Sequence, residues 1–537
     1  MHSPIANRQS PIRWAFALAV PLLFALFVRT APLIEGGDRL RHQCITEDGY
    51  LMLTIARNIA LGHGFSIANG EIATNGTQPL TTLLFAGCIW LAGGDRILGL
   101  YPVVAAQILW SIAGAIALYF CTRSLLYRGP HAKLVALLAA ALWFFSPTSL
   151  YHMQNGLETG LYSLLILLSI AAYDLLRPKL MGAASWGACL ALGVLLGLTF
   201  LARNDACFLI AVMLVVHLIV MYRRGTGSRG FLQCFAIGLS SIAIASPWLW
   251  FNVSRFGHVV PVSGRAEAHN VVFAHNLRYA FIALLENLTL LLRIPGSLER
   301  SMTTTMASAL LLFVGGLYAW RKRNWFTANF SPGTGILAAF VAVLFVYYAL
   351  FFGMPGFLGR YLFPVTILSA IVLASLAISI SISNLQSPIS NSRAVRGVSW
   401  IIMAFALLLT IAFNLRIYRN GRNHLHSQVV AWVDENVPED VYVGATQTGT
   451  LGYYHDRTIN LDGKVNPIAF EYRKQQRIAE YARTANVQYI VDWVGHAAWA
   501  KLPEFAPYYE LIVEDRDKNL AVLQLKQPEG SAIADQR

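Results

Sequence analysis

Charged residues are scarce in this chain of 537 residues. They make up 13% of it, about half of the roughly 25% that is usual in soluble domains. Hydrophobic residues make up 56%, and the mean hydropathy is +0.52. The shortage of charge comes with long apolar runs, which excludes an ordinary soluble protein and predicts a polytopic membrane protein.

Several common functional motifs are also missing. The six cysteines have no CxxC or Cys/His spacing, which argues against a disulfide framework or a zinc site. There is no Walker loop, no dinucleotide-binding glycine turn, no HExxH and no GxSxG. No nucleotide site is evident as an energy source, so an activated lipid would have to supply the energy for any group transfer. Internal repeats are absent as well.

The apolar runs predict eleven membrane-spanning helices of about 20 residues each. The first follows a basic tail without a convincing cleavage site, so we expect it to be retained. A further apolar stretch, 79–93, is too short for a clear assignment. The eleven predicted spans are 13–34, 97–120, 132–150, 157–176, 183–202, 206–222, 231–251, 303–320, 334–353, 361–381 and 398–415.

The charges of the loops indicate whether the apolar stretch 79–93 crosses the membrane. The net charge is +13, and its basic residues cluster in short loops, a positive-inside pattern that argues against nucleic-acid binding. If 79–93 does not cross, the basic loops all share the side of the N-terminal tail, so we predict an interfacial or re-entrant helix there. These basic residues are Arg8, Arg13, Arg123, Arg128, Lys133, Arg177, Lys179, Arg223, Arg224, Arg229, Arg321, Lys322, Arg323, Arg393 and Arg396.

The resulting topology places the N-terminus in the cytoplasm and the C-terminus outside. Residues 1–415 form the predicted transmembrane domain. From residue 416 to 537, charged residues become frequent and helical and strand patterns alternate. Helices are expected at 421–436 and 468–485, and strands at 441–443, 458–461, 489–491 and 520–523. We therefore predict an α-helical polytopic membrane protein with a small extracytoplasmic α/β domain.

Two adjacent carboxylates, Glu47 and Asp48, follow the first span and precede a short amphipathic helix. Such a helix is expected to lie at the bilayer surface. Acidic residues at the end of a span are often only solvated, but a pair placed before an interfacial helix suits chemistry on a lipid-carried substrate. Asp48 lies near the predicted helix N-terminus, whose dipole favours the ionised carboxylate that a general base requires.

Other polar residues on the predicted outer face are candidate substrate contacts. Hydrogen bonds to sugar hydroxyls, ion pairs in a shared polar pocket and contacts to a lipid phosphate are the expected roles. A turn, a helix end or surface ion pairing is the alternative for several of them. Arg265 and Arg360 are the two arginines that we pair with a phosphate, because a guanidinium fork matches phosphate oxygens. The other candidates are Arg57, His63, Asn75, Gln78, Asn155, Glu158, Arg203 and Asp205.

The first outer loop resembles that of integral-membrane glycosyltransferases with the GT-C fold, which use polyprenyl-phosphate-linked sugars. The resemblance rests on 47–50, 55–60, 62–66 and 74–80, with weaker likeness at 156–159, 201–205 and 460–467. The cell-wall arabinofuranosyltransferases, the lipid A aminoarabinose transferases and the protein O-mannosyltransferases are closest in pattern. In those families an acid nine residues before the helix arginine serves as base, and Asp48 has this position. Glu47 replaces a frequent aspartate.

The resemblance implies an inverting glycosyltransferase of a bacterial inner membrane. It would transfer a sugar from a polyprenyl-phosphate donor to an extracytoplasmic glycan, lipid or protein, with Asp48 as base. No cofactor beyond the lipid-linked donor is expected, and no metal-ligand spacing occurs. A transporter or lipid flippase is the main alternative, although its ionisable groups would lie nearer the midplane. A non-catalytic membrane subunit is a third.

Overall fold

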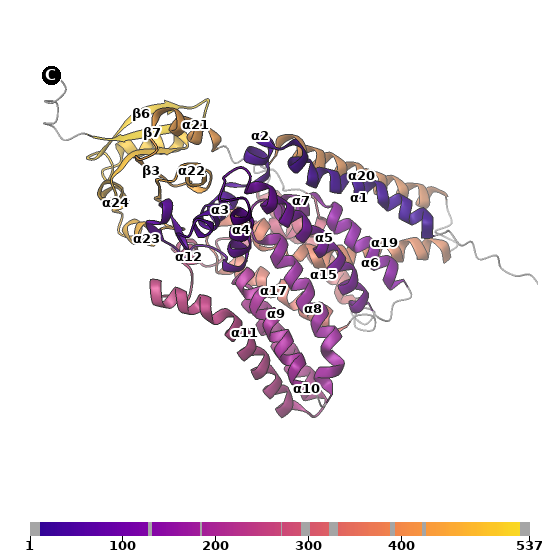
Figure 1. The fold of residues 1–537 in the computed structure, drawn as a ribbon. Coiled ribbons are helices and arrows are strands. Elements are labelled where there is room, and N and C mark those ends of the chain that lie inside the picture. Colours follow the sequence, from indigo (N-terminus) through magenta and orange to yellow (C-terminus); the bar gives the residue numbers. More distant parts are fainter. Residues whose placement is uncertain are drawn as a thin grey trace, which may run out of the picture.

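The computed structural model describes residues 11–126, 131–182, 185–269, 271–291, 301–321, 331–386, 393–421 and 426–526. A helical bundle makes up most of the molecule, and a small mixed sheet lies at one end of it (Figure 1). Of the basic residues used for the topology, Arg8, Arg128, Lys322 and Arg323 lie outside the described ranges. The protein is a multi-pass membrane protein with a C-terminal sheet region, as the sequence predicts.

Every predicted span overlaps a helix of the bundle. The long apolar runs form helices because each satisfies its own backbone hydrogen bonds, which lipid requires. The helices are α1(Pro11–Glu35), α5(Leu100–Leu125), α6(Ala132–Phe145) with α7(Pro147–Met153), α8(Thr159–Met181), α9(Trp186–Ala202), α10(Ala206–Arg223), α11(Gly227–Phe256), α15(Met302–Arg321), α17(Pro332–Leu350), α19(Val365–Gln386) and α20(Arg393–Asn420).

Length and composition support fewer crossings than eleven. Within the described ranges, five helices are long and apolar enough to cross a membrane, and three sharply bent pairs raise this number to eight. One bend separates α6 from α7 by 60°, at the Ser146-Pro147 step. Proline lacks the N–H that would continue the helix, so a new one begins there. The number of eleven stays a prediction.

The first outer loop lies between the bundle and the sheet (Figure 1). It contains α2(Gly37–Arg39), the π-helix η1(Leu40–Cys44), α3(Glu47–Ala60), the hairpin β1(Ser66–Ile67) and β2(Ile72–Ala73) around η2(Ala68–Gly70), and α4(Pro79–Leu91). The amphipathic helix predicted after the two acids is α3. The helix predicted at 79–93 is α4, whose 13 residues are fewer than the roughly 20 that a crossing needs.

Helix α3 is buried on two sides, by different parts of the chain. Its Ile55 packs into a cluster with Ile459, Leu461 and Val465 of the C-terminal region. Its Leu53 and Ala56 pack with α4 and α5. The prediction of a surface helix therefore describes its pattern but understates its burial, because the sheet domain covers the face turned away from the bundle.

A second outer segment follows α11. It contains α12(Val262–Ala268) and α13(Leu277–Thr289), and the later connection between α17 and α19 holds η3(Pro355–Phe357) and α18(Leu358–Tyr361). Helices α12 and α18 lie at the same end of the bundle as the first outer loop, since residues of all three segments line the pocket described below. The topology predicted from loop charge requires this placement.

The C-terminal region is built on a five-stranded sheet of order β4-β3-β5-β7-β6. Strands β3(Tyr442–Ala445), β4(Thr458–Asn460) and β5(Val487–Asp492) are parallel, and β7(Leu520–Leu525) runs antiparallel between β5 and β6(Tyr509–Asp515). Its helices are α21(Ser427–Asn436), α22(Gly449–Tyr454), α23(Pro467–Lys474), α24(Ile478–Thr484) and the 3-10 helix η4(Val494–Lys501).

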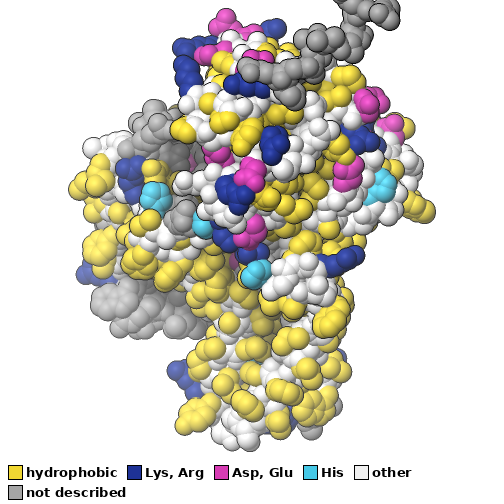
Figure 2. All heavy atoms as spheres, turned by 90° about the vertical axis from the view of Figure 1, so that its left-hand side faces the viewer, with side chains coloured by type: hydrophobic (Ala, Val, Ile, Leu, Met, Phe, Trp, Pro, Cys, Tyr) yellow, Lys and Arg dark blue, Asp and Glu magenta, His cyan; other side chains and the backbone are white. Residues whose placement is uncertain are grey.

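Four of these strands lie where the sequence predicts them. The helix predicted at 468–485 is instead two helices, α23 and α24, separated at Gln476, which has a positive φ of 57°. Strand β6 was not predicted. Figure 2 shows charged side chains gathered over the sheet domain and the junction below it, whereas the helices farther down present mostly hydrophobic side chains.

Candidate active site

A cavity of about 550 Å³ lies where the bundle, the first outer loop and the sheet domain meet. Its lining comes from α3, the turn before α4, the starts of α8 and α10, the ends of α11 and α17, α12, α18 and the loop after β4. The spanning helices contribute only residues near one end. The cavity therefore lies at one end of the bundle and not at its middle.

Asp48 lies in the first turn of α3 and lines this cavity. Thr46 precedes the helix as its N-cap, accepting a hydrogen bond from the amide of Gly49 at 3.2 Å. Arg360 donates from Nη1 to Asp48 Oδ2 at 3.2 Å. The side chain of Asp48 is 31% exposed and that of Arg360 15%, so the carboxylate remains open to a ligand while the guanidinium is held among aromatic rings.

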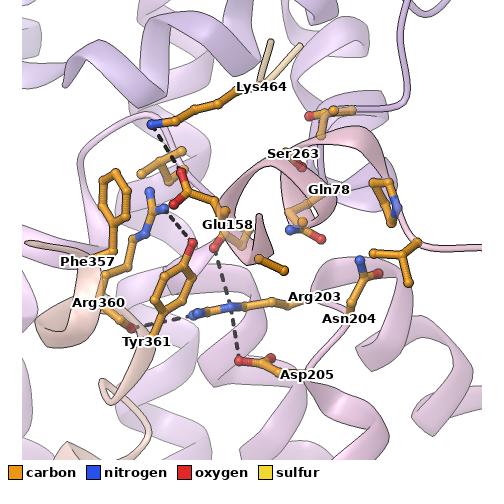
Figure 3. A pocket seen from close by; sticks show the side chains of 18 of the residues that line it. Gln78, Glu158, Arg203, Asn204, Asp205, Ser263, Phe357, Arg360, Tyr361 and Lys464 are labelled. Carbon is orange, nitrogen blue, oxygen red and sulfur yellow. Dashed lines mark hydrogen bonds and ion pairs between the residues drawn. The ribbon is translucent and has the colours of Figure 1, made fainter. Parts of the chain in front are cut away.

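Arg203 forms a second charged cluster deeper in the lining. Its Nε lies 3.3 Å from Asp205 Oδ2 and 3.8 Å from Glu158 Oε1, and all three side chains are buried. Tyr348 donates to Asp205 at 2.7 Å. The guanidinium of Arg203 stacks over the ring of Tyr361 at 4.4 Å, and Figure 3 shows it between Glu158 and Asp205. Stacking and pairing keep this buried charge in one orientation.

Lys464 reaches the cavity from the sheet domain (Figure 3). Its Nζ lies 3.1 Å from Glu267 Oε1 of α12 and 3.9 Å from Asp462 Oδ2. Burial alone lowers the pKa of Lys464, but Asp462, Glu267 and Asp48 raise it above its ordinary value. Burial raises the pKa of Glu267, and Lys464 partly opposes that shift. Lys464 therefore enters the site as a cation.

Several buried polar atoms of the lining have no hydrogen-bond partner within the described part of the protein. Three are donors, Arg203 Nη2, Arg360 Nε and Trp248 Nε1. Three are acceptors, Gln78 Oε1, Asp205 Oδ1 and Glu267 Oε2. A buried polar group without a partner costs about 1–3 kcal/mol. The cavity is therefore suited to a ligand that brings both acceptor oxygens and hydroxyl donors.

The structure brings half of the predicted site residues to the cavity. Those that line it are Asp48, Gln78, Glu158, Arg203, Asp205 and Arg360. They come from five separate segments of the chain. The spacing of these residues along the sequence does not relate them, but the topology predicted from loop charge places all of them on one side of the membrane.

The other predicted site residues lie outside the cavity and have different contacts. Arg57 pairs with Asp456 at 2.8 Å, and Arg265 with Glu471 at 3.1 Å. Asn75 Oδ1 accepts a hydrogen bond from the amide of Val262, and Asn155 Oδ1 accepts one from the amide of Leu157. His63 is exposed beside Gly70. Glu47 is turned toward the sheet domain, where Thr450 donates to it.

Three lining residues were not singled out from the sequence. Lys464 and Glu267 belong to motifs that were noted only for their neighbours, and Tyr361 follows Arg360. Each of the three lies in an outer segment that contains charged residues, and this is the signal in the sequence that could have found them. Nothing local distinguishes Glu267 from Arg265 two residues earlier, because only the turn of α12 determines which one faces the cavity.

No three His, Cys, Asp or Glu side chains gather as a metal-ion site in the described ranges. Comparison with family models matches residues 414–527 to a domain of unknown function, DUF8728. Comparison with curated proteins by sequence gave no match.

Solved structures share the fold of nearly the whole chain. ArnT from Cupriavidus metallidurans bound to undecaprenyl phosphate has 14% identity and a TM-score of 0.58, covering 96% of this chain and 98% of that one. An Archaeoglobus fulgidus oligosaccharyltransferase tethered to an acceptor peptide has 14% identity and a TM-score of 0.53, covering 93% and 72%. The oligosaccharyltransferase AglB from Archaeoglobus fulgidus, in complex with an inhibitory peptide and a dolichol phosphate, has 14% identity and a TM-score of 0.50, covering 94% and 73%. At this identity the likeness establishes the fold.

Proposed function

From the GT-C fold that this chain shares with ArnT and AglB, we propose that it is an inverting glycosyltransferase that uses a polyprenyl-phosphate sugar. The acceptor is an extracytoplasmic glycan, lipid or protein. Residues 1–415 form the catalytic membrane domain in this proposal, and residues 416–537 an outer domain. The site faces the outer side of a bacterial inner membrane, with the N-terminus in the cytoplasm.

Asp48 is the proposed general base. It accepts the proton of an acceptor hydroxyl, whose oxygen forms a bond to the anomeric carbon of the sugar. The bond between that carbon and the phosphate oxygen breaks, and its electron pair leaves on the lipid phosphate. One carboxylate on the acceptor side suffices for this single displacement, and no covalent enzyme intermediate is needed.

Arg360 and Arg203 are suited to the departing phosphate. Each has a buried N–H donor without a partner in the described part of the chain. Both guanidiniums are held by aromatic stacking, Arg203 over Tyr361 at 4.4 Å and Arg360 over Phe357 at 5.3 Å. Donors that are already oriented stabilise developing negative charge without reorganising. Arg360 also contacts Asp48, so base and phosphate site are adjacent.

The sugar and the lipid chain have complementary surfaces in the same cavity. Glu267 Oε2 and Gln78 Oε1 are buried acceptors that sugar hydroxyls can donate to. The end of α11 and the loop after it add Trp248, Leu249 and Val260 to the lining. Val260 is 53% exposed, which leaves an apolar edge where a polyprenyl chain can continue into lipid.

The coexistence of unpartnered donors, unpartnered acceptors and apolar walls around one accessible carboxylate is the observation that supports this proposal most. A transporter would place its ionisable groups nearer the middle of the bilayer. Here Asp48, Glu158 and Arg203 lie at one end of the bundle. We claim no cofactor beyond the lipid donor, and the proposal leaves divalent metal open.

Purified protein in nanodiscs tests the proposal. Wild type and Asp48→Asn are incubated with a panel of undecaprenyl-phosphate sugars and with a cell-envelope extract that supplies the acceptor hydroxyl, and released undecaprenyl phosphate is measured by mass spectrometry. Release by wild type alone, with equal donor binding by both, is the expected result. Movement of intact lipid-linked sugar across liposomes by both proteins, without release, would establish the flippase instead. Mass spectrometry of envelope glycans and lipids from a deletion strain then identifies the acceptor.

A further inference from the structure

A buried acid–imidazole–acid cluster joins the first outer loop to the sheet domain, outside the cavity. His426 lies between Glu47 of α3 and Asp492 at the end of β5. Its Nδ1 is 4.0 Å from Glu47 Oε2, and its Nε2 is 3.5 Å from Asp492 Oδ1. The side chains of His426 and Asp492 are 0% exposed, and that of Glu47 is 11% exposed. We call these three residues the clamp.

Glu47 binds the first turn of α22 on one side of the clamp. It accepts hydrogen bonds from the amides of Gly449 and Thr450 and, at 2.5 Å, from the hydroxyl of Thr450. A Cβ at Gly449 would collide with the carbonyl oxygen of Glu47. Only glycine therefore allows α22 to approach the backbone of α3 so closely. Glu47 faces the sheet domain while its neighbour Asp48 faces the cavity.

Asp492 holds the other side of the clamp. Its Oδ2 accepts from the amide of Thr446 at 2.7 Å, from the Thr446 hydroxyl at 2.6 Å and from the amide of Gln447 at 3.3 Å. His496 of η4 lies 3.6 Å from Asp492 Oδ1. The clamp thus ties α3 to the loop that leads from β3 to α22.

The charges of the clamp favour a protonated imidazole between two carboxylates. Burial lowers the pKa of His426, but Glu47 and Asp492 raise it above 6.5 overall. Burial raises the pKa of Asp492, but His426, His496 and Thr446 lower it to about 2. His42 of η1 bonds Ser427, the residue after His426, at 2.8 Å, and burial lowers the pKa of His42.

The sign of the pH dependence follows from these shifts. The pKa of His426 is raised in the folded protein, so protonated His426 stabilises the fold fully at pH values below its unfolded pKa of 6.5. That contribution is lost as pH rises through the folded pKa. An aspartate with a lowered pKa stabilises above its unfolded value of 3.8, and the contribution is lost as pH falls toward 2. The clamp is therefore intact in mildly acidic solution and loosens as pH rises through the raised pKa of His426.

We infer that Glu47, His426 and Asp492 dock the outer domain onto the first outer loop and thereby position Asp48 and Lys464 in the active site. His426 is a positioning residue that acts through Glu47, and Glu47 is not a second base. This inference rests on the proposed function for its kinetic consequence. It also gives the matched domain of unknown function, residues 414–527, a part in catalysis.

The geometry connects the clamp to both ends of the site. Asp48 is one peptide bond from Glu47. A Cβ at Gly76, beside the cavity, would collide with the carbonyl oxygen of Lys464, so the loop that carries Lys464 also fits tightly. Misplacement by about 1 Å can cost roughly 10²-fold in rate. Loosening the clamp should therefore lower kcat by about 10- to 100-fold and change KM for the lipid donor little.

His426→Gln, Glu47→Gln and their double variant test the inference in full-length protein in nanodiscs. Exposed His131 supplies the matched control, His131→Gln. Both single variants should lose kcat, and the double should lose no more than either, because the residues act as one unit. Wild type should lose kcat as pH rises through the raised pKa of His426. His426→Gln, already loosened, should lack that decline.

Hydrogen exchange at the amides of Gly449 and Thr450 gives a readout that does not depend on activity. We expect faster exchange at these amides in both clamp variants than in wild type. The control variant should exchange at the same rate as wild type. Exchange at the wild-type rate in both single variants would overturn the clamp. So would a double variant whose loss of kcat equals the product of the two single losses. A wild type inactive on every lipid donor would instead refute the proposed function, and the exchange measurement would still decide the clamp. Thermal unfolding of each variant confirms that it folds.

Discussion

Glu47 and Asp48 are adjacent acids with opposite surroundings. Glu47 is bonded to amides of α22, and Asp48 is 31% exposed beside Arg360. Consecutive residues of a helix point about 100° apart, so a pair at the first turn can serve two neighbouring structures. The sequence favours Asp48 as the base through its place near the helix N-terminus and through a family resemblance. The packing of the sheet domain on α3 gives the two acids different surroundings.

Asp48→Asn should abolish most turnover. The amide has nearly the shape of the carboxylate, so packing survives, but it does not accept the acceptor's proton. Loss of a general base costs roughly 10²–10⁴-fold in rate. Turnover of lipid donor by purified protein measures this, with Asp38→Asn as control because Asp38 lies in the same loop with its side chain 92% exposed. Near-normal turnover by Asp48→Asn would remove the centre of the proposed mechanism.

Arg360 and Arg265 should differ in their effect on donor binding. Arg360→Lys keeps the charge but loses the planar fork, and a hydrogen bond to a charged group contributes about 1.5–3 kcal/mol. We expect the Kd for undecaprenyl phosphate to rise roughly 10- to 150-fold, measured by native mass spectrometry. Arg265→Lys should change it by less than about fivefold, since a surface pair such as Arg265–Glu471 contributes at most about 1 kcal/mol. A larger rise in Kd for Arg265→Lys than for Arg360→Lys would instead assign the phosphate site to Arg265.

At the scale of elements, α3 organises the active site. Its first turn holds Asp48, and one side packs on the sheet domain while the other packs on α4 and α5. Gly49 allows this placement, because a Cβ there would collide with the carbonyl oxygen of Asn155. The same carbonyl accepts hydrogen bonds from the amide and hydroxyl of Thr46. Small displacements of α3 therefore disturb both its cap and Asp48, the proposed base.

Gly49→Ala should destabilise the protein. The added methyl group meets rigid backbone, and overpacking of this kind costs about 1–3 kcal/mol. Gly87→Ala in α4 is the matched control, because a Cβ at Gly87 meets open space and alanine is favoured over glycine within a helix by roughly 0.5–1 kcal/mol. Thermal unfolding in detergent should show a lower midpoint for Gly49→Ala alone. Equal midpoints would mean that α3 can shift without cost.

At the scale of the whole molecule, the pocket-lining segments share one end of the bundle. With eleven spans, the basic loops all lie at the opposite end of the bundle from the pocket. Because basic loops remain in the cytoplasm, the pocket is predicted to face the outside. The structure shows the segments together (Figure 1), and the side of the membrane remains a prediction.

Reporter fusions should locate the two faces. We expect fusions at Arg223 and Arg321 to report the cytoplasm, and fusions at Asp48, Arg265 and Asp462 to report the outside. The reason is that α4, with 13 residues, is too short to cross and so does not invert the later loops. A shared location for Arg223 and Asp48 would show that α4 crosses after all.

The sequence by itself determined what depends on local pattern. Apolar runs of about 20 residues specify spanning helices, short runs rich in apolar residues specify β3, β4, β5 and β7, and the acid–amphipathic arrangement specifies α3. The gathering of outer segments followed from loop charge alone. Six predicted site residues, Asp48 and Arg360 among them, could be placed in one pocket for that reason.

Only the tertiary structure decided which side of each segment faces the pocket. Glu267 and Arg265 lie in one turn of α12, yet one lines the cavity and the other pairs with Glu471. Lys464 is 416 positions from Asp48 in the chain (464 − 48) and enters the same site. Such contacts depend on how the sheet domain packs against the first outer loop. No periodicity within a segment encodes that packing, because it arises from side chains on two segments fitting together.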